Sequence, residues 1–252
     1  MVVFPNAKIN IGLNIVAKRP DGFHNIESIF YPVVDVYDVL EIIESKILKF
    51  TSSGIDIPGR NEDNLCLKAY HLLKKEFNIP PVHIHLLKAI PIGAGLGGGS
   101  SDAAFTLKLL NEKFALQLSD DQLMDYARKL GSDCAFFIKN KPVYAFHKGD
   151  EFEPIDLDLS AYKIKIAYPN IHIGTAEAYD GVAPRASKND LRKLKVDAIQ
   201  EWKNDVKNDF EKTILPHYPA IQELKEKFYD QGALFASMTG SGSAVFGIFG
   251  KK

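Results

Sequence analysis

The hydrophobic pattern changes its period along the first third of the chain. Apolar and polar residues alternate over residues 8–15 and 36–43, which is the period of a half-buried β-strand. Apolar positions then recur at helical spacing over residues 64–77, and a further alternating stretch follows at residues 82–86, after two adjacent prolines. The pattern therefore predicts a β-rich opening, one helix, and a strand that leads into a glycine-rich segment.

The remainder of the chain mixes helices and strands. The apolar-rich stretch 103–114 predicts a helix, and Ser119 with Gln122 forms a capping box for a helix that ends at Gly131. Further elements are expected in the second half: a strand at 163–168, helices near 190–213 and 220–231, and a hairpin at 233–249. This mixture predicts an α+β protein, and a change of composition near residue 155 predicts two domains, residues 1–155 and 156–252.

Composition and charge exclude several classes of protein. The chain has 252 residues, of which 46% are hydrophobic and 25% charged, values typical of a folded globular protein rather than a fibrous or disordered one. The chain has 31 Lys and Arg residues against 32 Asp and Glu residues. Because it has no excess of positive charge, nucleic acid is not expected as a partner. No apolar run approaches the roughly 18 residues that cross a bilayer, so no membrane partner is expected either.

The two cysteines and the N-terminal stretch predict a cellular location. Cys66 and Cys134 lie in apolar surroundings and offer neither a disulfide framework nor a zinc site, which fits a reducing compartment. The apolar N-terminus has neither a basic leader nor a small-residue cleavage site and therefore reads as mature protein. Together these features predict a cytoplasmic protein.

A glycine-rich loop separates the strand predicted at 82–86 from the helix predicted at 103–114. Five glycines stand between Gly93 and Gly99, and Ser100 and Ser101 follow directly. Glycines allow the backbone to approach a ligand closely and to point several N–H groups at it, and the N-terminus of the following helix attracts anions. The loop therefore predicts a phosphate-binding site, because a simple connection would not need so many glycines.

Two better-known phosphate motifs fit this loop less well. Gly93, Gly95 and Gly98 satisfy the spacing of the dinucleotide fingerprint, but the acidic residue expected about twenty positions later falls at Glu112, within a helix. The Walker motif needs a lysine after its last glycine, whereas Gly99 follows Gly98 here. The sequence therefore argues against both a Rossmann dinucleotide site and a P-loop.

The loop resembles that of the GHMP kinases, the superfamily of galactokinase, homoserine kinase, mevalonate kinase and phosphomevalonate kinase. The resemblance rests on the run PIGAGLGGGSSDAA at residues 91–104. Five shorter motifs stand in the order seen in one branch of that superfamily, whose substrate carries cytidine: PNAKIN at 5–10, DGFH at 21–24, LGSDCAFF at 130–137, NDFE at 208–211 and TGSGS at 239–243. The resemblance therefore covers nearly the whole chain.

This resemblance implies a fold and a reaction. The implied fold is an α+β, two-domain GHMP kinase fold, with a left-handed βαβ crossover in the N-terminal domain and a smaller α/β sandwich as the C-terminal domain. The implied reaction is transfer of the γ-phosphoryl group of ATP, with Mg²⁺, to the 2-hydroxyl of 4-diphosphocytidyl-2-C-methyl-D-erythritol, in the non-mevalonate route to isoprenoids. The oligomeric state and the ligands of Mg²⁺ are left open.

The resemblance also implies roles for single residues. Asp133 matches the catalytic aspartate and Lys8 the lysine that orients it, a pairing that suits proton removal from an alcohol during phosphoryl transfer. His24 matches the position that hydrogen-bonds the cytosine, and Phe23 and Tyr179 match the aromatic residues that stack on its ring. The remaining matches are Asn10 and Thr175 for the substrate, Asn64 near the adenine, and Gly93, Gly95, Gly97, Gly98, Gly99, Ser100 and Ser101 for the phosphates.

Most of these residues also have a structural explanation. Asp133 could cap the short helix that follows it, and Lys8 could be an exposed charge on an edge strand. The other structural explanations are core packing for Phe23 and Tyr179, a strand position for Thr175 and a helix N-cap for Asn64.

Three other functions stay open at this point. The first is a kinase of another alcohol, such as homoserine, mevalonate or a sugar, and a failure to bind cytidine nucleotides would favour it. The second is a catalytically silent binding protein with the same fold, against which the joint presence of Lys8 and Asp133 argues. The third is a hydride-transferring Rossmann enzyme, which binding of nicotinamide would reveal.

Overall fold

The computed structural model describes residues 1–251, and their contacts group them into two units that interleave along the chain. The first unit contains residues 1–7, 33–92 and 97–141. The second contains residues 8–32, 93–96 and the described part of 142–252. These units do not follow the predicted division into residues 1–155 and 156–252, so a domain boundary near residue 155 stays a prediction.

The first unit is built on a four-stranded mixed sheet. Its strands are β1 (Val2–Val3), β4 (Val39–Glu44), β6 (Val82–Lys88) and β5 (Lys49–Gly54), in that spatial order. The pairs β1–β4 and β4–β6 are antiparallel, whereas β5 and β6 are parallel. The parallel strands β5 and β6 are joined through the helix α1 (Leu65–Lys74) and so form a βαβ unit, and the left-handed crossover that the resemblance implies stays a prediction.

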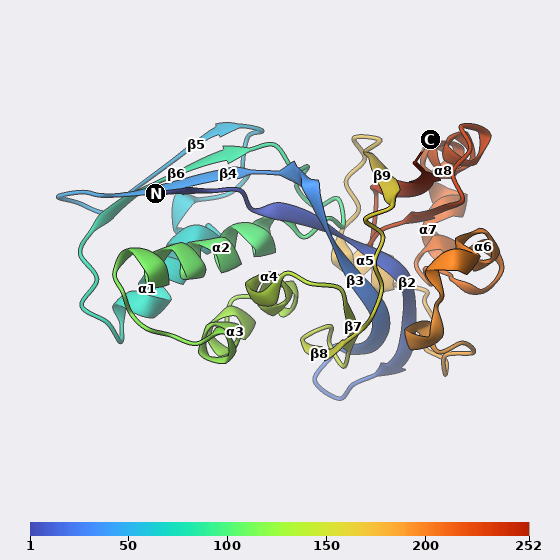
Figure 1. Ribbon diagram of the computed structural model, residues 1–252, viewed down its shortest axis with the longest axis horizontal. Coiled ribbons are helices and arrows are strands. Elements are labelled where there is room, and N and C mark those ends of the chain that lie inside the picture. Colours follow the sequence, from blue (N-terminus) through green and yellow to red (C-terminus); the bar gives the residue numbers. More distant parts are fainter. Residues whose placement is uncertain (252) are drawn as a thin grey trace. The chain divides into compact units, whose positions relative to one another are not determined.

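Helices cover one face of this sheet, as Figure 1 shows for α1 to α4. These helices are α1 (Leu65–Lys74), α2 (Gly98–Lys113), α3 (Asp120–Arg128) and α4 (Phe136–Lys139), with the 3₁₀ turns η1 (Asn61–Asp63) and η2 (Ser132–Ala135). The predicted capping box of Ser119 and Gln122 at the start of α3 is confirmed. The helix predicted from residue 103 begins earlier, at Gly98, so the last glycines of the loop are already helical.

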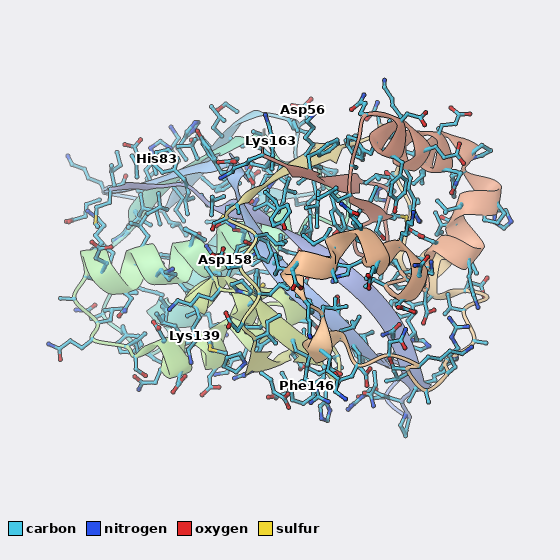
Figure 2. All side chains as sticks on the ribbon, turned by 45° about the vertical axis from the view of Figure 1, so that its right-hand side comes forward. Asp56, His83, Lys139, Phe146, Asp158 and Lys163 are labelled. Carbon is cyan, nitrogen blue, oxygen red and sulfur yellow. The ribbon has the colours of Figure 1, made fainter. Side chains whose placement is uncertain are left out.

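The strand β6 shows how the sequence pattern separates the two faces of the sheet. Val82, Ile84 and Leu86 are buried, while His83 and His85 alternate with them and are half-buried. Figure 2 shows His83 on the side of the sheet away from the helices. The His83 and His85 rings both lie within hydrogen-bond distance of the Thr51 hydroxyl, at 2.8 Å each, so the two histidines form a polar strand face.

The second unit contains two sheets. One has the order β2 (Asn6–Lys18), β3 (His24–Tyr37), β7 (Val143–Phe146) and β8 (Glu151–Pro154), and β2 and β3 both continue into residues of the first unit. The other has the order β10 (Phe235–Met238), β11 (Val245–Gly250) and β9 (Tyr162–Ala167), all antiparallel. The predicted hairpin at 233–249 is therefore confirmed as β10 and β11.

The segment predicted as a helix near 190–213 is not one continuous helix. It contains η3 (Leu191–Lys193), η4 (Val196–Glu201), α6 (Trp202–Asp205) and the start of α7 (Glu211–His217). Ile199 and Trp202 are buried in this segment, and Val206, also buried, takes an extended conformation between α6 and α7. The predicted helix near 220–231 is confirmed as α8 (Pro219–Asp230), and α5 (Thr175–Tyr179) completes the helices of this unit.

The described residues contain no helix that could span a membrane. In residues 1–251, each helix is too short or too polar to cross a bilayer. Both cysteines are buried free thiols, as expected for residues in apolar surroundings.

Candidate active site

Lys8 is buried inside the second unit, near the beginning of β2, and only 3% of it is exposed. Its ammonium donates to the Asn10 Oδ1 at 2.5 Å and to the Gly95 carbonyl at 3.2 Å, and it lies 5.0 Å from the centre of the Phe30 ring. These contacts exclude an exposed charge on an edge strand. A buried, positioned ammonium suits stabilisation of negative charge that develops during a reaction.

Asn10 connects this lysine to a distant turn of the same unit. Its Nδ2 donates to the Ser28 Oγ at 2.9 Å, while its backbone N–H donates to the Thr239 Oγ1 at 3.0 Å. The Thr239 hydroxyl lies 3.3 Å from the Gly95 carbonyl, to which it donates. Lys8, Asn10 and Gly95 are therefore held in one buried hydrogen-bonded network, in which each orients the next.

Two glycine turns of the second unit come into direct backbone contact. Gly95 has φ +79°, and a Cβ added there would lie 2.1 Å from the Thr239 carbonyl oxygen. Gly240 has φ +56°, and a Cβ there would lie 3.0 Å from Gly95. Ala244 also donates its backbone N–H to the Ala94 carbonyl at 3.1 Å. Both turns need glycine because of positive φ and because no side chain fits between them.

The NDFE motif fastens the second glycine turn to the sheets. The Asn208 Nδ2 donates to the carbonyls of Met238 and Gly240, at 2.9 Å each. The Asp209 carboxylate accepts from the Ile15 N–H of β2 at 2.9 Å. The Glu211 carboxylate accepts from the Met238 N–H and from the Ser237 hydroxyl, at 2.9 and 3.0 Å. The motif therefore acts as a structural support, with its polar side chains used inside the protein.

The end of the glycine loop forms the N-terminus of α2 in the first unit. Gly97 is the N-cap with φ +70°, and the first turn contains no acidic residue. A Cβ at Gly98 would lie 2.8 Å from the Lys88 ammonium, whereas a Cβ at the exposed Gly99 would make only an ordinary contact with Leu65, at 3.9 Å. The Ser101 hydroxyl is buried and has no hydrogen-bond partner among residues 1–251. The free N–H groups and positive end of a 16-residue helix make this a place where an anion binds favourably.

Asp133 lies on the 3₁₀ turn η2, which packs against α2 in the first unit. Its side chain is half-buried, and its neighbour Cys134 is fully buried. Burial raises the pKa of the Cys134 thiol to about 12, so this cysteine is a packing residue without nucleophilic character. Because Asp133 belongs to the first unit and Lys8 to the second, their pairing in one site stays a prediction.

Three of the aromatic rings expected near the cytosine pocket lie in the second unit. The rings of His24 and Tyr179 are stacked, with centroids 4.5 Å apart, and Tyr179 also meets the buried Phe210 edge-on at 4.9 Å. Phe23 is 55% exposed and lies under the ammonium of Lys148, at 5.3 Å. Phe23 is therefore not a core residue, and the stacking of Phe23 and Tyr179 on a base stays a prediction.

The environment of His24 favours its neutral form. Burial, followed by the charge of Lys18, lowers the pKa of the imidazole below its usual value. The turn before it is closed by the Arg19 N–H, which donates to the Phe23 carbonyl at 2.8 Å. A neutral imidazole at the start of β3 offers one hydrogen-bond donor and one acceptor to a ligand.

The last two candidates occupy helix termini. Asn64 is the N-cap of α1, and its side chain accepts from the Cys66 N–H at 2.8 Å, which confirms the structural explanation for this residue. Thr175 is exposed at the first position of α5, so the strand position considered for it is wrong. The contacts of Asn64 with adenine and of Thr175 with the substrate stay predictions.

Several residues of this site escaped the sequence reasoning. Ser28, Thr239 and Asn208 complete the network around Asn10, and Phe210 supports Tyr179. The TGSGS and NDFE motifs did signal that residues 208–211 and 239–243 matter, but not that they meet. The two motifs meet across 32 residues at Asn208 and Gly240, and Asn10 meets Thr239 across 229 residues, and local periodicity records neither contact.

Comparison with known proteins agrees with this architecture. The family model described as the GHMP kinases N terminal domain matches residues 64–141, and the GHMP kinases C terminal model matches residues 186–252. A solved structure of a 4-(cytidine 5'-diphospho)-2C-methyl-D-erythritol kinase matches with a TM-score of 0.82 and 29% identity, covering 98% of this chain and 90% of that one. A mevalonate kinase structure matches at 0.66 and 19% identity, which shows the shared fold alone.

Two curated relatives are similar over the whole length. The 4-diphosphocytidyl-2-C-methyl-D-erythritol kinase of Cytophaga hutchinsonii is 54% identical, over 100% of this chain and 93% of the relative. That of Bacteroides fragilis is 51% identical, over 99% and 92%. The chain therefore belongs to the GHMP kinases, and within them to the family of 4-diphosphocytidyl-2-C-methyl-D-erythritol kinases. The α+β, two-domain kinase fold expected from the sequence is thereby confirmed.

The glycine contacts give a first test of this site. Gly95→Ala is expected to lower the free energy of unfolding by at least about 1–3 kcal/mol, because the new methyl group meets the Thr239 carbonyl and the backbone has positive φ. Gly99→Ala is the matched control, since its Cβ would make only an ordinary contact with the Leu65 side chain, at 3.9 Å, and alanine favours the helix by up to about 1 kcal/mol. Urea unfolding followed by circular dichroism measures both, and equal stability of the two variants would refute the close approach.

Proposed function

We propose that this protein transfers the γ-phosphoryl group of ATP to the 2-hydroxyl of 4-diphosphocytidyl-2-C-methyl-D-erythritol. The observation that carries this proposal is the 54% identity, over the whole chain, to a relative whose name states that substrate. The buried network around Lys8 supports it, because a protein without catalysis has little reason to maintain a desolvated ammonium. The likeness to homoserine and mevalonate kinases is one of fold and favours neither of their substrates.

The glycine loop is the proposed binding site for the nucleotide phosphates. Gly97, Gly98, Gly99, Ser100 and Ser101 belong to the first turns of α2, where free N–H groups and the helix dipole favour negative charge. Gly93 and Gly95 keep positive φ in the other part of the loop. Asn64 is proposed to lie near the adenine while it caps α1.

Asp133 and Lys8 are the proposed catalytic residues. As a phosphoryl group passes to the alcohol, Asp133 accepts the hydroxyl proton, and the Lys8 ammonium orients the hydroxyl and offsets the negative charge that develops. The hydrogen bonds of Lys8 to Asn10 and Gly95 fix the position of its charge, so that little reorganisation is needed during the reaction.

The substrate is proposed to bind through its cytosine. His24 hydrogen-bonds the base, Phe23 and Tyr179 supply aromatic surfaces, and Asn10 and Thr175 contact the remainder of the substrate. Exposure of Phe23 and the support of Tyr179 by Phe210 are compatible with these roles.

Mg²⁺ is proposed to enter with ATP. The described residues contain no cluster of three or more His, Cys, Asp or Glu side chains suited to a metal, and Mg²⁺ in kinases is commonly bound by substrate phosphates and water with few protein ligands. The ion would neutralise part of the phosphate charge. The protein is proposed to be located in the cytoplasm, because its buried free thiols suit a reducing compartment.

The assigned base is tested by Asp133→Asn. This change is expected to lower kcat by about 100-fold or more, because the amide cannot accept the proton, while ATP affinity changes little. ADP release with Mg²⁺ and ATP measures turnover on 4-diphosphocytidyl-2-C-methyl-D-erythritol, homoserine and mevalonate. Asp125→Asn on α3 is the control, since Asp125 is an exposed carboxylate, 72% accessible at its side chain.

The outcomes separate the candidate functions. Turnover with the cytidine substrate alone supports the proposal, whereas turnover with homoserine or mevalonate would replace the substrate and keep the kinase. If Asp133→Asn retains most activity, the assigned base is wrong. Nucleotide binding without turnover on any of the three alcohols would favour a silent binding protein.

The lowered pKa of His24 predicts how substrate affinity depends on pH. Because the pKa of His24 lies below its usual value near 6.5, most of the imidazole is neutral between about pH 8 and 7, so the KM for the cytidine substrate is expected to be nearly flat there. At lower pH protonation removes the acceptor nitrogen, and KM is expected to rise. His24→Gln does not titrate, so its KM should be flat over the whole range. A wild-type KM that already rises between pH 8 and 7 would contradict the neutral His24.

A further inference from the structure

A cluster of three charged side chains is buried beneath the start of α2, entirely within the first unit. Lys88 at the end of β6 is 4% exposed, Asp102 in the second turn of α2 is 3% exposed, and Asp38, directly before β4, is 0% exposed. The Lys88 ammonium donates to the Asp38 carboxylate and, at 2.9 Å, to the Asp102 carboxylate. One cation is therefore shared by two acidic groups away from water.

The two acidic groups have different surroundings. One oxygen of Asp38 accepts from the N–H groups of Ala89 and Ile90, at 2.6 and 2.8 Å, and the other accepts from Lys88. Asp102 accepts from Lys88 through Oδ2, while its Oδ1 is buried and has no hydrogen-bond partner among residues 1–251. Both oxygens of Asp38 therefore have hydrogen-bond donors, which suits the ionised form. One oxygen of Asp102 has none, and burying an ionised oxygen without a donor is costly.

Charge balance leads to the same assignment. With both acids ionised, the cluster would carry one uncompensated negative charge in the interior, whereas a proton on Asp102 makes it neutral. Burial raises the pKa of Asp102 to about 7. The charge of Lys88 opposes this shift, and the charge of Asp38 adds to it. Asp102 is therefore close to half protonated near neutral pH.

The other titratable groups packed around α2 do not supply a positive charge that could balance an ionised Asp102. Burial and then Asp102 raise the pKa of the Cys66 thiol on α1, which stays neutral. η2 brings Cys134, also neutral, and the half-buried Asp133 against the helix. Farther along α2, burial lowers the pKa of Lys108, and the charge of Asp120 on α3 opposes this shift. Lys139 of α4 forms an ion pair with Asp121. From β4, the buried residues Leu40 and Ile42 are apolar.

The cluster touches the loop that is proposed to bind phosphate. A Cβ at Gly98, the first residue of α2, would lie 2.8 Å from the Lys88 ammonium, so the cluster lies directly against the backbone of this turn. Asp102 follows Ser101, whose hydroxyl is also buried without a partner. A change of charge at Asp102 therefore acts on an anion at the helix N-terminus through a poorly screened interior.

We propose that Asp102 is a positioning residue that carries a proton when nucleotide phosphate is bound at the N-terminus of α2, and that its ionisation weakens nucleotide binding. The inference rests on the proposed function, since it needs phosphate at this turn. Neutral Asp102 leaves Lys88 and Asp38 as a balanced pair, whereas ionised Asp102 repels the phosphates. Binding of nucleotide near and just above neutral pH therefore takes up a fraction of a proton from the solvent at Asp102.

The affinity for Mg²⁺–ADP, measured by calorimetry between about pH 6 and 8.5, tests this role. The wild-type protein is expected to lose up to roughly 10-fold in affinity as pH rises, which corresponds to a pKa change of about one unit. Asp102→Asn should bind with an affinity nearly independent of pH, because its amide can accept from Lys88 and donate to Asp38 without titrating. Asp125→Asn should keep the wild-type dependence, because it removes an exposed carboxylate and leaves Asp102 in place, while titration of the nucleotide itself is common to all three proteins.

A second measurement does not depend on nucleotide. Carbon-13 NMR of labelled aspartate carboxyls in the wild-type protein should show one group that titrates near neutral pH, and this signal should be absent from Asp102→Asn. If every aspartate titrates below about pH 5, the proton is not there and the proposal is wrong, whether or not the variant folds.

The combined outcomes distinguish this inference from the proposed function. Tight binding that is equally independent of pH in the wild type and in Asp102→Asn overturns the role of Asp102 and leaves the kinase intact. A wild-type protein that binds no nucleotide at any pH overturns both. A pH dependence that survives in Asp102→Asn assigns the effect to another group and also overturns the inference.

Discussion

The backbone contact between the two glycine turns is the constraint on which the second unit depends. Gly95 and Gly240 approach so closely that neither position has space for a side chain. Because Thr239 lies in the same contact, its hydroxyl reaches both Asn10 and Gly95, and through them Lys8. The NDFE motif holds the second glycine turn in place, since Asn208 donates hydrogen bonds to the carbonyls of the residues on either side of Thr239. The position of one lysine is thus determined by three segments that are distant in sequence.

Both units use buried charge where ordinary packing would use apolar groups. In the second unit an ammonium is desolvated against an amide, a carbonyl and an aromatic ring. In the first unit an ammonium and two carboxyls are enclosed together below a helix N-terminus. Replacing such groups by hydrophobic residues often stabilises a protein, so their presence is better explained by function than by stability. In both cases the charges adjoin the glycine loop that is proposed to bind phosphate.

The sequence predicted local structure better than it predicted contacts. Strands at 8–15 and 82–86, the capping box at Ser119 and the final hairpin followed from periodicity and capping chemistry, which act over a few residues. Helices were expected near 190–213, but this segment is divided into short helical turns and Val206 is extended and buried, so tertiary packing overrides the local preference. Candidate residues were found through motifs. Their supports, such as Thr239 and Lys88, were not, because they are defined by long-range contact.

The interleaving of the two units has a consequence for synthesis on the ribosome. All segments of the first unit have been made once residue 141 is polymerised, so it can fold while the rest is still being translated. Residues 8–32 emerge early but belong to the unit that is completed only by the C-terminal half. These strand residues, which include Lys8 and Asn10, must therefore wait for most of the translation time, since Thr239 follows Asn10 by 229 residues in a chain of 252. The most buried part of the candidate site is thus the last to be assembled, and a chain that stalls in its second half carries an exposed, apolar strand.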